Sequence, residues 1–516
     1  MNNDLQTVFN YHETTKHSQQ RYARSLGYMD WSTQPDPFRN YNGTRSIELP
    51  LSFDNATPPY HLLDSDLPPA PLLGQSLSQL LQFSMGIAAY KESGGGSWAV
   101  RCNASSGNLH PTESYLVLPP MMKNDKTSVH HYTPKNHGLE LLNEFDTSFW
   151  NNLPENSFLL GLSSITWREV WKYGERAFRY TQLDAGHAWQ SLVVSAKMLG
   201  WKITRLDSVS DSDIDTLFGL KQEGRFFERE NADMLFVISK ESVDSTIDVD
   251  DLLEQVSLKF SGVANKLSKS MQSWDIIPAI EDSTSIMQIP QNNVIKSDIQ
   301  RAPTQESKNI ILNRRSIHIM HKDTSLITKD EFHTVLSSVN GSLDSKENSA
   351  HLAIFVHRVE EYDSGLYILV RNDRDLESLE LNMHDDFLWK RTELENLYFL
   401  ESRDFKLASK SISCNQDIAS DGAFSMGMLC NFSEQLQSHG AHRYKELYWE
   451  CGMIGQELYL ESTSLGLSGT GIGCFLDDAM HGLLGLKNNT FQVLYHFTIG
   501  RGNVDSRIMT KPAYNR

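Results

Sequence analysis

Two long stretches of the chain carry apolar residues at the spacing of an amphipathic helix. In the first stretch, between residues 185 and 199, apolar residues recur three or four positions apart, as they do on the buried face of a helix. They are Ala185, Ala188, Trp189, Leu192, Val193, Ala196 and Leu199. The second stretch carries Cys451, Ile454, Leu458, Ser462 and Leu465. Both run into a Leu-Gly pair, which is typical of a helix C-cap. The pattern therefore predicts two long helices.

Short runs of β-branched and aromatic residues predict strands between and after these helices. The run DMLFVIS at 233–239 closes the first part of the chain, and VLYHFTI at 493–499 closes the second. Three further runs lie at 114–118, 351–357 and 366–370. A capping box from Thr328 to Glu331 predicts the start of another helix. Helices that alternate with few strands favour an α+β fold.

The two helices belong to a longer internal repeat, whose copies are related by the offset that carries Gly161 onto Gly427. The same offset holds without a net gap from Phe158 to Leu220 of the first copy, as about ten matched pairs show. The pairs include Phe158 with Phe424, Gly161 with Gly427, Gly174 with Gly440, Gly186 with Gly452, Gln190 with Gln456, Leu192 with Leu458, Gly200 with Gly466, Asp211 with Asp477, Gly219 with Gly485 and Leu220 with Leu486. A chance likeness between two amphipathic helices is the alternative. The repeat predicts two halves, 1–245 and 306–516, joined by a linker over 246–305.

Composition and charge narrow the class of protein. The 516 residues include 47 basic and 65 acidic side chains, a net charge of −18, whereas binding to a phosphate backbone needs a basic surface. Nucleic acid is therefore not expected as a main partner. The polar N-terminus lacks the hydrophobic core of a signal peptide, and no window approaches the roughly 18 apolar residues of a membrane span. Five cysteines without a CxxC pair indicate a reducing cytoplasm.

The segment ASSGNLHPTE, residues 104–113, is a candidate ligand loop. Its hydroxyl and amide groups can hydrogen-bond a polar heterocycle, and its glycine allows a close backbone approach. The candidate contacts are Arg101, Ser105, Ser106, Gly107 and Asn108. A purely structural turn is the alternative.

Two basic segments are candidates for binding a phosphate. ILNRRSIHIM contains Arg314, Arg315, Ser316 and His318, and two guanidinium groups beside a hydroxyl suit a phosphate monoester. FTIGRG, after the last predicted strand, adds Arg501. The alternatives are a solvated basic pair at a helix end and a surface arginine.

The segment GLSGTGIGCF, residues 466–475, is rich in glycine but follows a helix, so it does not match the dinucleotide-binding fingerprint. Gly471, Ile472 and Gly473 are expected to expose backbone N–H groups to a flat ligand, with a flexible loop as the alternative. The first copy has Ile203, Arg205 and Asp207 at the positions that correspond to 469, 471 and 473. Motifs for P-loops, HExxH metalloproteases and GxSxG hydrolases are absent, and no metal is predicted.

Together these segments resemble the flavin-dependent nitroreductase superfamily, specifically its SagB/ThcOx-type dehydrogenase branch. RRSIH is similar to the RRSxR phosphate motif of that superfamily, and ASSGNLHP to its PSSxNxxP loop with Ala104 in place of proline. GTGIGCF resembles the loop that donates an N–H to flavin N5. Arg501 sits where the family has a C-terminal phosphate-binding residue, and WKYGERAFRY with DAGHAWQS looks like the SagB-type KYGxRxYR…GH signature. The resemblance covers residues 70 to 502.

The resemblance implies FMN as cofactor, in a composite site. Family members are usually homodimers in which one subunit supplies RRS, the N5 loop and the terminal arginine, and the partner supplies the PSSxN loop. Here the first half keeps SSGN but has Pro59-Tyr60-His61 roughly where RRS belongs. The second half keeps Arg314, the glycine segment and Arg501, but has SLDSKENSA at 342–350 in place of SSGN. We expect one FMN per chain, in a monomeric pseudo-dimer or a homodimer.

The function implied is an FMN-dependent oxidoreductase that transfers hydride through N5 to or from a small organic substrate, with NAD(P)H a possible donor. An azoline dehydrogenase in ribosomal peptide maturation is an alternative, because azoline-oxidising relatives use a Lys-Tyr pair in proton removal that Lys172 and Tyr173 match. In the structural alternative, Tyr173 is a core residue and Lys172 is exposed to solvent. His318 replaces the usual Arg or Lys and weakens positive charge near N1 and O2. A non-catalytic flavin-binding or scaffold protein is the alternative of another class.

Overall fold

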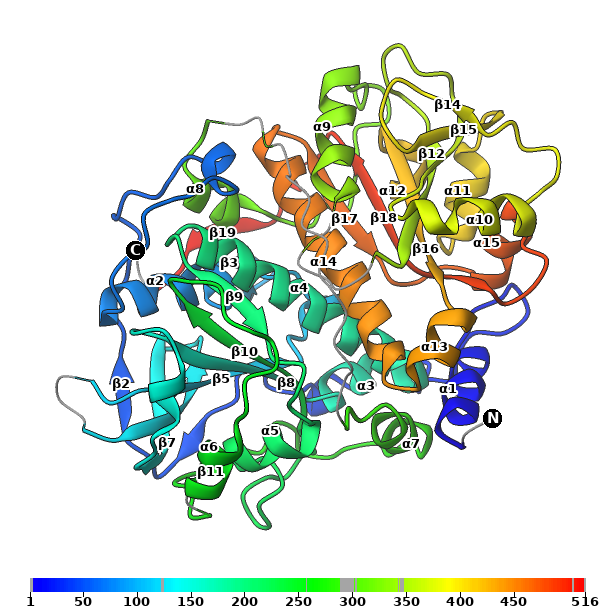
Figure 1. Ribbon diagram of the computed structural model, residues 1–516. Coiled ribbons are helices and arrows are strands. Elements are labelled where there is room, and N and C mark those ends of the chain that lie inside the picture. The colour runs from blue at the N-terminus through cyan, green and yellow to red at the C-terminus, as the bar shows by residue number, and fades with distance from the viewer. Residues whose placement is uncertain are drawn as a thin grey trace.

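The fold is organised around two long helices, α4 (Ala177–Lys197) and α14 (Arg443–Ser464), which pack against each other between two sheets (Figure 1). The structure is a computed structural model that describes residues 3–121, 125–256, 258–287, 301, 304–341, 343, 348–503 and 505–514. Both predicted helices are confirmed, and each begins about two turns before the apolar pattern does. The early turns escape the pattern because polar residues such as Arg179 and Lys445 are buried there and paired with carboxylates of the opposite half.

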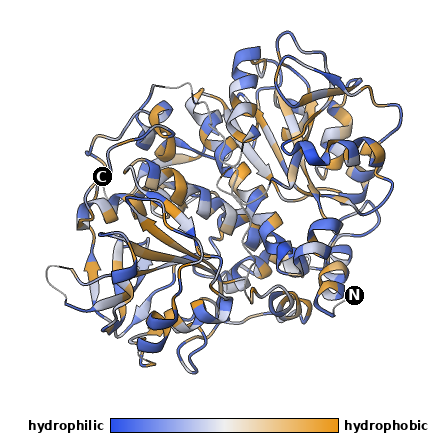
Figure 2. Cartoon of the chain, in the orientation of Figure 1, coloured by the Kyte–Doolittle hydropathy of each residue, from blue (hydrophilic) through white to orange (hydrophobic). Residues whose placement is uncertain are grey.

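Two antiparallel sheets of seven strands flank the helix pair, with apolar residues concentrated inside both (Figure 2). The first sheet has the order β2 (Ser46–Glu48), β7 (Gly138–Phe145), β6 (Thr127–Thr133), β5 (Thr112–Leu118), β8 (Phe158–Ser164), β10 (Asn231–Ser239) and β9 (Lys202–Arg205). The second has the order β14 (Lys390–Arg391), β15 (Leu397–Ser402), β13 (Gly365–Leu369), β12 (Ala350–Val356), β16 (Phe424–Asn431), β18 (Phe491–Gly500) and β17 (Ser468–Ile472). All five predicted strand runs are confirmed, as is the α+β class.

The sequence repeat corresponds to a repeat of structural elements. The offset between the copies carries the first residue of α4 onto that of α14, and α3 (Trp167–Tyr173) onto α13 (Ser433–His439). It also carries α5 (Asp211–Phe218) onto α15 (Asp477–Leu484), and both end at a glycine with left-handed backbone, Gly219 and Gly485. Beyond this point the register changes, because the offset would carry the start of β10 onto Phe497, whereas β18 begins at Phe491. The two copies therefore have the same order of helices and strands, although the register of the sequence match ends before their last strands.

Further helices cover the outer faces of the pair in matching positions. α2 (Gly74–Ser84) packs on α4, and α9 (Lys329–Asn340) packs on α14. The capping box predicted at the start of α9 is present, because the Thr328 hydroxyl accepts from the N–H of Glu331. The remaining short elements are η1 (Trp31–Thr33), η2 (Tyr60–Leu62), η3 (Ser106–Asn108), η4 (Phe149–Asn152), η5 (Gly174–Arg176), α8 (Ser307–Asn313), η6 (Asp373–Asp375), α10 (Leu376–Asn382), α11 (Lys406–Ile412) and α12 (Ile418–Asp421).

The two ends of the chain cross over to the opposite parts of the molecule. α1 (Asn3–Thr14) reaches the second half, where the His12 ring is hydrogen-bonded to Tyr444 and Gln492. Near the other end, β19 (Met509–Pro512) joins the hairpin of β3 (Ile87–Ser93) and β4 (Gly96–Arg101) in a three-stranded sheet. Each half is thus completed by chain from the other end of the sequence (Figure 1).

The described part of the predicted linker packs on both halves, since residues 250–264 join the first half and Arg301 forms an ion pair with Glu457 of α14. β11 (Val263–Ala264) pairs with β1 (Tyr41–Asn42), and α6 (Asp250–Gln255), which precedes β11, contributes Leu252 to the core of the first half. α7 (Ile276–Ser283) lies beside α1 and buries Ile277 and Ile280. The domain boundaries at 245 and 305 stay predictions, and residues 288–300 lie outside the described residues.

α4 and α14 cross at a pair of glycines that the repeat relates to each other. A Cβ on Gly186 would lie 2.2 Å from the carbonyl oxygen of Trp449, and a Cβ on Gly452 would lie 2.2 Å from that of Leu183. The repeat relates these two contacts to each other, since the offset between the copies carries residue 186 onto 452 and residue 183 onto 449. The helices touch backbone to backbone, and any side chain at the crossing would force them apart.

Two buried ion pairs secure the same interface. Arg179 Nη1 lies 2.8 Å from Asp477 Oδ1, and Lys445 Nζ lies 2.8 Å from Asp211 Oδ2. The same offset relates these pairs to each other. Burial favours the neutral form of Asp477, but Arg176 and Arg179 outweigh it and hold the pKa of that carboxyl well below its usual range. Loss of one partner from such a pair costs about 3–5 kcal/mol, because it leaves a buried charge uncompensated.

We predict that Gly186→Ala lowers the free energy of unfolding by about 3 kcal/mol, because the new methyl group meets a backbone carbonyl that cannot rotate away. Gly452→Ala should do the same. Gly482 in α15 is the matched control, since a Cβ there meets nothing within 4 Å. Gly482→Ala should stabilise the protein by about 0.5–1 kcal/mol through helix propensity. Urea unfolding measures all three, and equal effects at residues 186 and 482 would contradict the close crossing.

Candidate functional site

One large cavity collects almost every residue that the sequence singled out. Its volume is about 540 Å³, within the range of cofactor sites. It lies between the β3–β4 hairpin, the loop before β5, the first half of α4, the last turns of α14 and strand β17. The predicted residues that line it are Arg101, Ser105, Ser106, Gly107, Asn108, Lys172, Tyr173, Arg314, Arg315, Ser316, His318, Gly471, Ile472 and Gly473.

One end of the cavity holds three cationic side chains without an acidic partner in the described chain. Arg314, Arg315 and Lys91 take part in none of the ion pairs found among the described residues. Burial and the neighbouring Arg314 lower the pKa of Arg315 to about 10, and burial with both arginines lowers the pKa of Lys91. Like charges gathered in this way repel one another, so the cluster favours an anionic ligand.

The arginine segment is joined directly to the glycine segment, although the two are far apart in the sequence. Ser316 pairs with Gly469 in a parallel bridge, and the Ile317 N–H donates to Thr470 Oγ1 at 2.9 Å. The hydroxyls of Ser316 and Tyr459 lie 2.8 Å apart, and the Gly471 N–H donates to the same Tyr459 hydroxyl at 2.8 Å. The two motifs therefore form one wall of the cavity.

The glycine segment is an edge strand, and the alternative of a flexible loop does not hold. Residues 468–472 form β17, which pairs with β18. Its glycines admit aromatic rings, because a Cβ on Gly471 would lie 1.8 Å from Tyr495 Oη and one on Gly473 would lie 2.4 Å from Tyr180 Cε1. Of the N–H groups expected to face a ligand, that of Gly471 is already used by Tyr459.

The SSGN loop is held by one buried carboxylate on α4. Asp184 Oδ1 accepts hydrogen bonds from both the N–H and the hydroxyl of Ser106, each at 2.9 Å. Burial raises the pKa of Asp184 to about 7, against the lowering effect of hydrogen bonds from Ser105 and Ser106. From the other half, Gln456 Oε1 accepts from the Ala104 N–H at 3.0 Å. The loop is thus fixed by both long helices.

Lys172 and Tyr173 lie against the turn of this loop. Gly107 has left-handed backbone, φ 59°, and a Cβ there would lie 2.7 Å from Tyr173 Oη and 3.0 Å from Lys172 Nζ. Burial raises the pKa of Tyr173 well above its ordinary value, so its hydroxyl is a proton donor at neutral pH. Both residues line the cavity, and both are partly buried.

Arg501 is the one predicted binding residue that does not line the cavity. Its Nη2 lies 3.2 Å from Glu331 Oε1, its Nε donates to the Leu326 carbonyl, and its side chain is 39% exposed. The capping carboxylate of α9 draws the guanidinium away. Lys91 on β3 occupies the cationic end instead, and only the fold could place it there, because its hairpin precedes the arginine pair by most of the first half of the chain.

Several cavity residues were missed from the sequence. Asp184 and His187 stand inside the segment DAGHAWQS, one helical turn apart, which was the available signal. Tyr459, Tyr495 and Cys474 carried no signal, because aromatic and cysteine residues at helical or strand spacing look like core.

The position that the repeat relates to this cavity is filled by an ion pair. Arg205, the counterpart of Gly471, places Nη2 2.7 Å from Glu446 Oε1, and Glu446 is the counterpart of Tyr180. Asp207, the counterpart of Gly473, joins them at 3.2 Å from Arg205 Nη2. Burial opposes ionisation of Glu446, but Arg205 and Arg443 lower its pKa far below the usual value. The counterpart of SSGN, at 342–350, falls largely outside the described residues.

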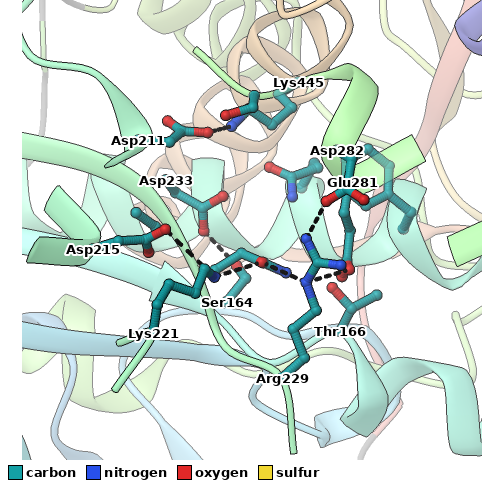
Figure 3. A pocket seen from close by; sticks show the side chains of 15 residues that line it. Ser164, Thr166, Asp211, Asp215, Lys221, Arg229, Asp233, Glu281, Asp282 and Lys445 are labelled. Carbon is teal, nitrogen blue, oxygen red and sulfur yellow. Dashed lines mark hydrogen bonds and ion pairs between the residues drawn. The ribbon is translucent and has the colours of Figure 1, made fainter. Parts of the chain in front are cut away.

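A second, smaller cavity of about 140 Å³ lies beside the inter-half ion pair of Asp211 and Lys445 (Figure 3). Its cations are already paired: Lys221 Nζ lies 3.4 Å from Asp215 Oδ2, and Arg229 Nε lies 3.2 Å from Glu281 Oε2. None of the predicted site residues lines it. Among the described residues no group of His, Cys, Asp or Glu side chains is arranged to hold a metal ion, and no helix is long and apolar enough to cross a membrane.

Comparison with known proteins finds a family match in the second half of the chain. Residues 366–501 match the Nitroreductase family. Over its whole length the chain is similar to the crystal structure of a candidate nitroreductase from Anabaena variabilis ATCC 29413, with a TM-score of 0.68 and 19% identity, covering 96% of this chain and 99% of that one. The match to the family is thus confined to residues 366–501, whereas the likeness of fold to a nitroreductase covers 96% of the chain.

Two further similarities are partial. A segment of 129 residues is 30% identical to the trifolitoxin-processing protein TfxB of Rhizobium leguminosarum bv. trifolii. That match spans 22% of this chain and 34% of TfxB, so it covers about a third of the length of that protein. A nitroreductase from Bacteroides fragilis NCTC 9343 with bound FMN shares 14% identity over 39% of this chain and 90% of its own, with a TM-score of 0.22.

We predict that Asp184→Asn changes how stability depends on pH. Burial raises the pKa of the folded-state carboxyl to about 7, so its favourable contribution is complete below about pH 4 and is lost as the pH rises through 7. Relative to the wild type, the variant should gain about 2 kcal/mol in unfolding free energy between pH 5 and pH 8, since one pKa unit corresponds to about 1.4 kcal/mol. Urea titrations at each pH test this. Parallel curves for the two proteins would show that Asp184 titrates normally.

Proposed function

We propose that the chain is an FMN-dependent oxidoreductase with one composite flavin site. The observation that carries the proposal is the large cavity in which Arg314, Arg315 and Lys91 face the same space as the SSGN loop. The arginines come from the second half, and the loop and lysine come from the first. In the superfamily that the sequence resembles, two subunits share these roles.

The residues present fit FMN at its phosphate end. Arg314 is buried and anchored by its own hydrogen bonds, from Nε to the Cys102 carbonyl at 3.1 Å and from Nη2 to the Arg101 carbonyl at 3.0 Å. Arg315 is oriented in the same way by the Leu312 carbonyl, at 2.7 Å from its Nη1. Anchored guanidinium groups lose little side-chain entropy on binding, and they suit the geometry of a phosphate monoester.

The lining next to the SSGN loop also fits a polar ring. Near the SSGN loop, Arg101 Nε, Asn103 Oδ1 and His110 Nδ1 are buried without a hydrogen-bond partner among the described residues. Buried polar atoms normally find a partner, and an unpaired group costs roughly 1–3 kcal/mol. A ligand with several donors and acceptors reduces this cost by making or rearranging such bonds.

When bound, FMN supplies hydride or electron transfer, and the chain supplies binding and orientation. Arg314, Arg315 and Lys91 would hold the phosphate, and Ser105 and Asn108 would contact the rest of the cofactor. Within the described chain no hydrogen bond uses the Gly473 N–H, so we assign it the contact to N5 that the family resemblance implies. His318 lies in the cavity without adding the fixed charge of an arginine.

One FMN per chain follows from the charge at the related position. There Arg205 and Glu446 occupy the space of a glycine and a tyrosine, and both side chains are largely buried. Opening that position for a ligand would separate a buried ion pair, which costs several kcal/mol.

Oxidation of azoline rings in a ribosomal peptide is the second candidate, and two observations favour it. The chain shares sequence with TfxB, which processes trifolitoxin. Lys172 and Tyr173 lie together at the cavity wall, as the Lys-Tyr pair of azoline-oxidising relatives would need to in order to assist proton removal. The related positions of the second half carry Ser438 and His439 instead.

We predict binding of one FMN per chain, with an affinity that Arg314→Ala lowers by about 10- to 100-fold, the usual value of a charge-assisted bond. Arg501→Ala is the matched control and should stay within about twofold, because Glu331 already holds that guanidinium. Quenching of FMN fluorescence measures both. Riboflavin, which lacks the phosphate, should bind the wild type and R314A alike. A stoichiometry of two, or loss of affinity in R501A instead of R314A, would contradict the composite site.

We also predict that Lys172→Ala lowers the rate of azoline oxidation at least about 100-fold, since it removes the general base. Affinity for FMN should remain within about twofold, because Lys172 is not part of the phosphate cluster. The assay follows the loss of two mass units from a thiazoline-containing model peptide. In a parallel assay, the protein oxidises NADH and passes the electrons to an artificial acceptor. Equal losses in both reactions would assign Lys172 to flavin positioning, and unchanged peptide oxidation would exclude it as the base.

A further inference from the structure

Two free cysteines meet at the wall of the large cavity. Cys414 Sγ and Cys474 Sγ lie 2.7 Å apart, although 60 residues separate them in the sequence. Cys474 directly follows Gly473 and lines the cavity, and both cysteines are partly exposed. A disulfide bond measures about 2.05 Å, so bond formation requires a shift of less than about 1 Å.

Hydrogen bonds already connect the two segments that carry the cysteines. The Leu476 N–H donates to the Ile412 carbonyl at 2.7 Å, and Gln416 Nε2 donates to the Cys474 carbonyl at 3.2 Å. These contacts connect the turn after α11 to the end of β17, just before and just after the cysteines. Disulfides form readily only where the backbone already holds both residues at bonding distance.

The surroundings distinguish the two sulfurs. Hydrogen bonds from the Cys474 thiol and from Tyr22, with the positive charge of Arg176, lower the pKa of Cys414 despite its partial burial. The hydrogen bond to Cys414, together with burial, raises the pKa of Cys474. Cys414 is thus the better nucleophile of the two, because the thiolate is the reactive form.

The chain contains an inert pair for comparison. Cys430 Sγ and Cys451 Sγ lie 3.6 Å apart, and both are fully buried between β16 and α14. Burial raises the pKa of Cys430 well above its ordinary value. A thiol with a raised pKa and no access to solvent does not exchange, so this pair is structural.

We propose that Cys414 and Cys474 form a reversible disulfide by exchange with a low-molecular-weight disulfide. The Cys414 thiolate attacks one sulfur of that molecule, forms a mixed disulfide and releases one thiolate. The Cys474 sulfur then loses its proton, attacks Cys414 Sγ and expels the second thiolate. The two protein thiols give up two electrons and two protons in total, and the small disulfide becomes two thiols.

The bond would act on the cavity through Gly473. It adds a covalent link beside the residue whose carbonyl accepts from Tyr180 Oη at 3.0 Å, and so fixes the end of β17 against the turn at 412–416. In a reducing compartment such pairs are transient and redox-sensing. The inference does not depend on flavin, since it concerns only the chain and a small disulfide.

We predict that native protein treated with glutathione disulfide loses two alkylatable thiols, that dithiothreitol restores both, and that Cys414→Ser abolishes the change. Trypsin alone cannot assign the bond, because it leaves Cys414 with Cys430 in 411–443 and Cys451 with Cys474 in 446–487. Further cleavage after glutamate separates 451–457 from 462–487. The proposed bond links 411–434 to 462–487, whereas the inert pair would link 411–434 to 451–457.

Cys430→Ser is the matched control and should leave the product unchanged. Iodoacetamide should label Cys414 in the untreated protein at least about 10-fold faster than Cys430, because only Cys414 combines access with a lowered pKa. A stable glutathione adduct on Cys414 without the cross-link, or a cross-link through Cys451, would overturn the proposal. Failure to bind FMN in the separate fluorescence assay would leave this result untouched, so the two proposals fail independently.

Discussion

The contact between α4 and α14 at Gly186 and Gly452 is the constraint on which the rest of the structure depends. Each glycine brings its helix against a carbonyl of the other, and the ion pairs Arg179–Asp477 and Lys445–Asp211 fix the rotation of the helices about that point. A side chain at either glycine would force the two backbones out of contact. The relative position of the halves is therefore set by backbone contact, and not by adaptable side chains.

This contact also decides where a ligand site can form. The first half of α4 carries Tyr180 and Asp184, and the last turns of α14 carry Tyr459. Because the helices cross in the middle, these two groups lie on the same side of the crossing and face the same cavity. A shift of the helices would separate the SSGN loop from the arginine segment, although neither touches the glycines.

The repeat offers two equivalent positions at this interface, and charge distinguishes them. At one, the glycines of β17 leave room for aromatic rings and a cavity. At the other, Arg205 and Glu446 close the space with a buried pair. The cationic cluster of Lys91, Arg314 and Arg315 stands at the open position, and no carboxylate of the described residues neutralises it. Of these two positions, the open one has the volume of an ordinary cofactor site.

The sequence by itself determined the two long helices, five of the strands and the repeat, and it proposed fifteen site residues, of which fourteen line the cavity. It succeeded because periodicity and motif order are local or nearly local properties of a chain. Arg501 lies away from the cavity, because a competing carboxylate on α9 binds that side chain. The sequence missed Lys91, Tyr459 and the Cys414–Cys474 pair, which only the tertiary structure decided. Proximity between residues so far apart along the chain depends on how whole elements pack, and packing distance leaves no trace in local sequence.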